Sequence, residues 1–354
     1  MFFLGIVLHA AWLCKNESLW LRGVHDFIHS FRMESFFLIA GLFSGMTVSK
    51  TSVDRYLWKR FRRLFIPMLF CGIALNTCLH CALHHQWHDF SFLVDASYWL
   101  NGEWLGHLWF LGNLLFYALL LYALHKLCPR IAFLFSAPFW NLPVLFLAIT
   151  FLRRSLLFVA NHTAGLESGT LLIAHWSEVL EYVAFFLAGY LLFYREDILT
   201  RLMDLALCNL ASVVLFWLAL PVMLSTYWGD QVFQLWRGVY SIQMCALLFW
   251  IARRFFNTPN QIVAAMSDAS YTIYLVHWPL MAILCWLLAP AQLPPLSLFS
   301  ILVLATSVVS YEAHKMIVAK SHFLLFLLNG RSAKASEDIA LGNVEDGPEM
   351  ARAA

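Results

Sequence analysis

Apolar residues occur along this chain in blocks of about twenty, separated by short polar stretches. An α-helix of that length spans the hydrocarbon core of a bilayer. The pattern predicts an all-α, polytopic membrane protein. Its transmembrane helices number about ten, at residues 1–14, 32–49, 64–83, 107–125, 138–152, 177–194, 205–225, 233–252, 269–288 and 297–317. No internal repeat is visible, so a transporter built from inverted halves gains no support.

Composition narrows the class of protein further. Of the 354 residues, 61% are apolar and only 12% are charged, whereas a soluble domain carries about 25% charged residues. This excludes a soluble enzyme, a protein that binds nucleic acid and a disulfide-stapled secreted domain. The eight cysteines lie mostly inside apolar blocks, where we expect them to act as small hydrophobic residues.

The placement of the cations predicts the orientation in the membrane. If the N-terminus is inside, 17 of the 23 Lys and Arg residues fall in cytoplasmic segments, which are 50–63, 126–137, 195–204, 253–268 and 315–354. By the positive-inside rule both termini are then cytoplasmic. Arg153 and Arg154 argue against this orientation, or indicate that the fifth helix is misplaced.

Two segments at the ends of the chain stand apart. Residues 329–354 are polar and rich in small residues, which predicts a disordered cytoplasmic tail after a membrane domain at 1–328. The opening MFFLGIVLHAAWLC lacks the basic flank and the cleavage site of a signal peptide. We expect it to be a membrane span whose beginning is missing.

Polar residues inside a membrane are costly and need a partner or a task. His9 lies in the first span, where it either satisfies a helix carbonyl or takes part in function. Just before the second span, His25, His29 and Arg32 follow one another at i, i+4 and i+7, and Asp26 lies beside them. On a continuous helix these residues share a face. A cluster facing a cavity is favoured over the polar lip of an interfacial helix, and no third ligand for zinc is evident.

A basic cluster closes the first cytoplasmic loop, in the segment KRFRRLFIP, which contains Arg60, Arg63 and Pro67. Such a cluster is either a positive-inside anchor or a grip for a phosphorylated ligand. Composition alone favours the anchor.

Histidines recur at the other spans. The segment CLHCALHHQWHD at the outer end of the third span could bind zinc, but its spacing matches no common zinc module. His107 and Trp109 begin the fourth span, and Tyr274 and His277 lie in the ninth. Aromatic residues there are typical of interfacial belts, whereas histidines repeated on separate spans indicate a function.

Four of these segments together resemble the acyltransferase-3 family of integral membrane enzymes. They are VHDFIHSFRMESFFLIAGLFSG, RFRRLFIPML, HLWFLGNLLFY and SYTIYLVHWPL. The resemblance runs from the first span to the ninth or tenth, and within the family it points to the branch concerned with periplasmic glucan biosynthesis. It implies a bacterial inner-membrane enzyme that takes an acyl group, with succinyl preferred, from cytoplasmic acyl-CoA. The acceptor would be a hydroxyl of an extracytoplasmic glucan.

The resemblance also assigns roles. His9 matches the histidine thought to be catalytic in the family, and Arg60 and Arg63 match an Arg-x-x-Arg element near the coenzyme's phosphates. The family arginine eleven residues before that histidine would precede Met1. We therefore expect either an upstream start or a truncated, inactive copy.

The chemistry of acyl transfer gives the remaining residues their expected roles. A base must take the hydroxyl proton, for which we expect His9, and a cation must hold the oxyanion, for which we expect Arg32. His25, Asp26 and His29 would orient the base or the sugar. Four further residues are expected to line the substrate cavity, namely His107, Trp109, Tyr274 and His277. We expect no metal, and membrane lipids as the surroundings.

Three alternatives stay open. The same fold could acetylate another exopolysaccharide or a lipid-linked sugar. Intramembrane histidines would also serve a transporter that moves a glycan or acyl group without forming a bond. A truncated copy could act only as a membrane scaffold.

Overall fold

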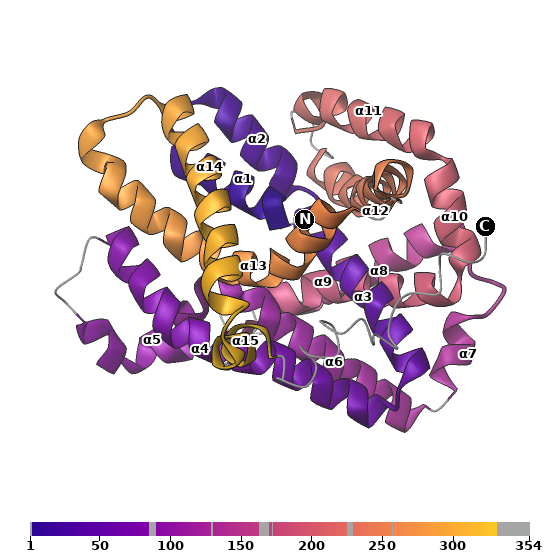
Figure 1. Cartoon of the computed structure of the whole chain (residues 1–354). Helices are drawn as coiled ribbons and strands as arrows, with labels where there is room; N and C mark the ends of the chain where they lie inside the picture. The colour runs from indigo at the N-terminus through magenta and orange to yellow at the C-terminus, as the bar shows by residue number, and fades with distance from the viewer. Residues whose placement is uncertain are drawn as a thin grey trace.

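The computed structural model describes residues 2–84, 90–128, 130–162, 170–171, 173–224, 229–256, 258 and 260–330. Helices make up nearly all of this part (Figure 1). The α-helices are α1 (Phe2–Cys14), α2 (Leu19–His29), α3 (Arg32–Lys50), α4 (Val53–His84), α5 (Ala96–Leu100), α6 (Trp109–Leu127), α7 (Ile131–Phe135), α8 (Leu142–His162), α9 (Trp176–Tyr194), α10 (Glu196–Asp204), α11 (Ala206–Leu224), α12 (Gly229–Phe255), α13 (Gln261–Leu288), α14 (Pro295–Ala313) and α15 (His322–Asn329).

Short elements connect these helices. They are the 3₁₀ turns η1 (Ser91–Val94), η2 (Glu103–Leu108) and η3 (Ala289–Ala291), the π-helical turn η4 (His314–Val318), and the strands β1 (Thr170–Leu171) and β2 (Ala174–His175). The two strands pair antiparallel, with Thr170 opposite His175.

The all-α membrane fold is confirmed, but the number of ten spans is not. In the described residues, seven helices are long and apolar enough to cross a membrane, or up to eight if the bent pair α10–α11 is one span. The expected first span is the shorter apolar helix Phe3–Cys14. The span expected at 233–252 lies in α12, where residues such as Ser241 and Gln243 reduce the apolar character. The expected tail lies outside the described residues from 331 onward.

The helix on which His25, His29 and Arg32 would share a face is not continuous in the structure. The chain turns at Ser30 and Phe31, so α2 ends at His29 and α3 begins at Arg32. The Ser30 hydroxyl donates to the Phe27 carbonyl at 2.7 Å, which occupies that carbonyl at the end of α2. The break places His25 and His29 on a different helix from Arg32.

The fifth helix extends further than the sequence predicts, which explains the two arginines that oppose the predicted orientation. Helix α8 continues to His162, so Arg153 and Arg154 lie within it and not in a loop. Arg153 is buried, with 3% of its side chain exposed, and its Nη2 donates to Glu181 Oε1 on α9 at 2.9 Å. A buried charge requires such a partner in a membrane.

Helices α3 and α9 pack closely because small residues face one another. Gly41 and Gly45 form a G-x-x-x-G pair on α3, the spacing that lets membrane helices approach. A Cβ atom added to Gly41 would lie 1.9 Å from the Phe186 carbonyl oxygen, and one added to Gly189 would lie 1.8 Å from that of Leu38. The backbones therefore touch at these positions, which fixes α3 and the residues it carries.

Replacing Gly189 with alanine is expected to lower the melting temperature of the purified protein, because the added methyl group forces the two backbones apart. Overpacking of this kind costs about 1–3 kcal/mol. Gly23→Ala is the matched control, since nothing lies within 4 Å of a Cβ atom there. Equal melting temperatures for the two variants would contradict this account of the packing.

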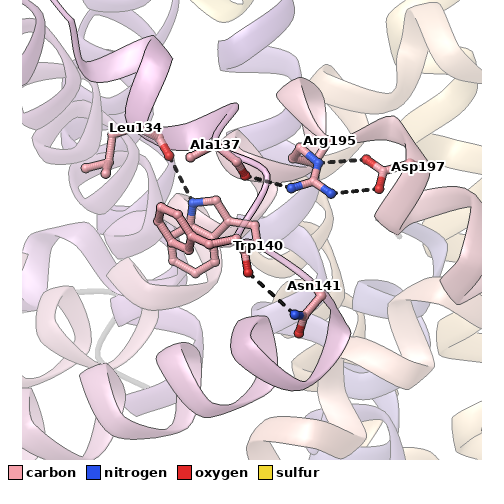
Figure 2. Close-up of polar contacts among 7 residues, drawn as sticks. Leu134, Ala137, Trp140, Asn141, Arg195 and Asp197 are labelled. Atoms are coloured by element: carbon pink, nitrogen blue, oxygen red, sulfur yellow. Dashed lines mark hydrogen bonds and ion pairs between the residues drawn. The ribbon is translucent and has the colours of Figure 1, made fainter.

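The segment between α7 and α8 is tied to the junction of α9 and α10 (Figure 2). Arg195 Nη1 donates to the Ala137 carbonyl at 2.7 Å, and Arg195 Nε and Nη2 each donate to a carboxylate oxygen of Asp197 at 2.8 Å. The Trp140 indole N–H donates to the Leu134 carbonyl at 3.0 Å. These bonds place the segments before α8 and after α9 at one face of the bundle.

Candidate active site

A cavity of about 540 Å³ lies among four elements of the bundle, α1, α3, α6 with η2, and α13. Its lining combines basic and aromatic side chains. The described residues that line it are Gly5, His9, Arg32, Met33, Phe36, His107, Trp109, Phe110 and Tyr274. Residues far apart in the sequence thus meet in one place, and five of them were predicted as site residues.

His9 reaches the cavity from α1 and is held by aromatic rings of α13. Its ring stacks on Trp278 with centroids 4.4 Å apart, and the His277 ring lies 5.3 Å away. Gly5 lies one helical turn before His9, so it shares this face of α1. The base expected from the sequence therefore borders the cavity.

Hydrogen bonds fix the tautomers of the other two histidines. A carbonyl oxygen only accepts, so a ring nitrogen bonded to one must carry the proton. His107 Nε2 donates to the Leu275 carbonyl at 3.2 Å, and His277 Nδ1 donates to the Tyr274 carbonyl at 2.6 Å. When neutral, His107 Nδ1 and His277 Nε2 each carry a lone pair, and both are buried and have no hydrogen-bond partner among the described residues.

The Arg32 guanidinium enters the cavity through space that a glycine leaves. A Cβ atom on Gly5 would lie 2.9 Å from Arg32 Nη1 and 3.6 Å from His277 Nε2. The arginine and His277 therefore approach the same point on α1. Arg32 Nε is buried and has no hydrogen-bond partner in the part of the chain that the structure describes, which leaves this charged group with a donor for a ligand in the cavity.

A second cavity, of about 1030 Å³, lies where α3 ends and α4 begins. Four of its lining residues are cationic. The described lining consists of Phe43, Met46, Thr47, Lys50, Thr51, Tyr56, Lys59, Arg60 and Arg63. Arg60 Nη2 donates to Ser44 Oγ at 3.3 Å, and the Tyr56 hydroxyl donates to the same oxygen at 3.1 Å, so this wall is anchored to α3.

One face of α3 joins the two cavities. Met33 and Phe36 line the first, and Phe43 and Lys50 line the second. Successive residues of this set are three, seven and seven positions apart, which puts them on the same side of the helix. The seven residues from Phe36 to Phe43 correspond to about 10 Å along the axis.

The structure does not bring every predicted residue to the first cavity. His25, Asp26 and His29 lie on α2 and contact one another instead. His25 Nδ1 and Asp26 Oδ1 are 2.8 Å apart, and the His25 and His29 rings stack with centroids 5.5 Å apart. None of the three is among the described residues that line either cavity.

Several lining residues were missed. Phe36 lies one turn after Arg32 and Phe110 lies next to Trp109, so helical spacing from the predicted residues was the available signal. Lys50 ends α3 and completes the basic lining of the second cavity. Gly5 gave no signal, because its role depends on the approach of Arg32 from another helix.

No group of three His, Cys, Asp or Glu side chains in the described part of the chain could hold a metal ion. The histidine-rich segment begins inside the last turns of α4, where the His80 ring stacks on that of Phe92 with centroids 4.1 Å apart. Residues 85–89 of that segment lie outside the described residues.

Fold and cavities define a multi-pass membrane protein with a buried histidine–arginine site and a basic pocket connected to it by one helix. The acyltransferase-3 family model, described as an acyltransferase domain, matches residues 1–312. The chain belongs to this family, which confirms the resemblance seen in the sequence, and it is a membrane O-acyltransferase.

Curated relatives align with nearly the whole length of this chain. Glucans biosynthesis protein C of Salmonella heidelberg (strain SL476) is 27% identical over 378 aligned residues, which cover 96% of this chain and 94% of the relative. The protein of the same name from Salmonella gallinarum (strain 287/91 / NCTC 13346) is 26% identical with the same coverage. No solved structure matches this chain.

Proposed function

We propose that the protein transfers an acyl group, with succinyl preferred, from cytoplasmic acyl-CoA to hydroxyl groups of a periplasmic glucan. The observation that carries this proposal is the pair of cavities on one face of α3, one basic and one lined by His9, Arg32 and His107. The names of the relatives support a glucan as the acceptor.

The basic cavity suits the anionic end of the donor. Coenzyme A carries phosphate groups, which arginine binds with paired N–H donors. With Arg60, Arg63, Lys50 and Lys59 at these phosphates, the thin arm of the coenzyme would follow α3 toward Phe36. The thioester would then reach the first cavity. In this proposal the four cations bind phosphate groups. A role as a positive-inside anchor alone would not require them to line a cavity.

The reaction needs only residues of this chain. The hydroxyl oxygen of the glucan attacks the thioester carbonyl carbon while His9 takes the hydroxyl proton. Arg32 holds the negative charge on the former carbonyl oxygen. The C–S bond then breaks, and the proton on His9 passes to the departing thiolate of coenzyme A. Trp109 and Tyr274 offer aromatic faces to the sugar.

This reaction requires the basic cavity to lie in the cytoplasm of a bacterium whose inner membrane holds the protein, with both termini inside. Contacts between the predicted cytoplasmic segments support their placement on one and the same side of the membrane. Lys126 Nζ lies 3.1 Å from Asp54 Oδ2, and Arg195 bonds to Ala137. Each contact joins two segments expected on the same side.

Two alternatives differ in substrate or in chemistry. Acetyl transfer to another exopolysaccharide or to a lipid-linked sugar would use the same two cavities. A transporter would use the histidines for proton coupling and would form no acyl product. The membership of an acyltransferase family favours the two enzymatic functions.

The test is expression in a bacterial strain that lacks glucan acylation, followed by mass spectrometry of the periplasmic glucans. We expect the mass of a succinyl group on the glucan, and a much smaller yield with Arg60→Ala, because one phosphate contact is lost. Arg55→Ala is the control, since this exposed arginine of α4 is not among the described lining residues. Unmodified glucan from membranes that contain the protein would overturn the acceptor, and an acetyl mass would overturn the donor.

A further inference from the structure

Two of the helices that carry the site contain a proline, Pro67 in α4 and Pro279 in α13. Proline has no backbone N–H, so the carbonyl four residues earlier loses its helical partner. The carbonyls affected are those of Arg63 and Leu275. A carbonyl that lacks its helical donor gains from a bond to another group, and in a membrane protein the gain is larger because little water is available.

Both carbonyls are bonded by a side chain from a different element. The Tyr271 hydroxyl of α13 donates to the Arg63 carbonyl at 2.7 Å. His107 Nε2 of η2 donates to the Leu275 carbonyl at 3.2 Å. Each proline thus creates an acceptor that a neighbouring element uses, and α13 takes part in both bonds.

The first of these bonds connects the two cavities. Arg63 lines the basic cavity, whereas Tyr271 lies one turn before Tyr274, which lines the histidine–arginine cavity. The α4 backbone is enclosed from a second direction by the end of α15. A Cβ atom on Gly330 would lie 2.6 Å from the Arg62 carbonyl oxygen and 2.7 Å from the Cα atom of Arg63.

We propose that Tyr271 is a positioning residue of the donor site. Its bond to the Arg63 carbonyl, which has no helical N–H donor at Pro67, fixes the α4 backbone so that Arg60 and Arg63 are aimed at the phosphates of acyl-CoA. It also fixes the position of the basic cavity relative to the cavity that His9 lines. This inference rests on the proposed function, because it assigns the ligand of the basic cavity to coenzyme A.

A double-mutant cycle tests the proposal. Tyr271→Phe removes the hydroxyl and leaves the Arg63 carbonyl without its donor. Pro67→Ala restores a backbone N–H that can bond to the same carbonyl, so the double variant regains what the single variant loses. The control is Tyr117→Phe, because the Tyr117 hydroxyl donates at 2.8 Å to the Val179 carbonyl, which also has a helical N–H available from Val183.

The measurements are the affinity for coenzyme A, by calorimetry on the purified full-length protein, and the melting temperature. We expect Tyr271→Phe to weaken coenzyme A binding about tenfold. The double variant is expected to return to within about twofold of the wild type, and Tyr117→Phe to stay near it. In the transfer assay Tyr271→Phe raises KM for the donor more than it lowers kcat.

Each outcome separates the two proposals. Wild-type affinity in Tyr271→Phe, or no recovery in the double variant, would overturn the role of Tyr271 while leaving acyl-CoA as the donor. A wild-type protein that binds no coenzyme A would overturn the proposed donor and, with it, the role of Tyr271 at that site. If the double variant then recovered its melting temperature, the bond between Tyr271 and Arg63 would be purely structural.

Discussion

Replacing His9 with alanine is expected to lower acyl transfer about 10²–10⁴-fold, the usual contribution of a general base. His9 is the histidine of α1 that lines the cavity, with its ring held against Trp278. Removing it takes away the acceptor of the hydroxyl proton without touching the basic cavity. The affinity for coenzyme A should therefore stay unchanged while the rate falls.

The measurement is the rate of glucan acylation by purified protein at saturating acyl-CoA. His322→Ala is the matched control, because this exposed histidine of α15 lies outside both described cavity linings and has no expected role in the site. If His9→Ala and His322→Ala acylate equally fast, His9 is not the base. The lone pair on His277 Nε2 would then be the next candidate, because the two rings lie 5.3 Å apart.

The sequence predicted which residues form the site better than it predicted how they are held. Polar residues inside apolar blocks are costly in a membrane and so indicate a function or a partner. This signal and the aromatic residues beside it identified His9, Arg32, His107, Trp109 and Tyr274. That they share one cavity depends on how four elements pack. A pattern along the chain does not contain this information.

Local breaks explain the main failure at the site. Spacing alone placed His25, His29 and Arg32 on one helical face, but a turn of two residues at Ser30 and Phe31 separates them. Both residues are compatible with a helix, so no proline or glycine signalled the turn. Pro67 did signal a local irregularity, yet the donor that compensates for it, Tyr271, lies more than 200 positions later.

Charged residues inside a helix also make its length difficult to predict from the sequence. The predicted fifth span ends just before Arg153 and Arg154, because arginines are rare inside membranes. The partner that allows one of them to stay, Glu181, lies on α9 and bonds to Arg153 at 2.9 Å. Pairing between helices therefore decides whether a charge marks the end of a span or its interior.

The second large effect is expected from Arg32, whose replacement by glutamine should lower kcat about 10²–10³-fold. Arg32 lines the cavity, and none of the described residues forms a hydrogen bond with its Nε atom. In the proposed reaction this charge holds the oxyanion that forms on the thioester carbonyl. The loss should appear in kcat because the oxyanion exists only in the transition state and the intermediate.

Two further variants separate the charge of Arg32 from its position. Arg32→Lys keeps the charge but loses the planar fork, so we expect a rate between those of the wild type and Arg32→Gln. Gly5→Ala keeps the arginine, but its methyl carbon would lie 2.9 Å from Arg32 Nη1 and must displace the guanidinium. A slow Gly5→Ala enzyme with unchanged coenzyme A affinity would show that the position of the charge matters. A fully active Arg32→Gln enzyme would contradict the oxyanion role, and the buried arginine would then serve to bind the acceptor or to hold α3 against α1.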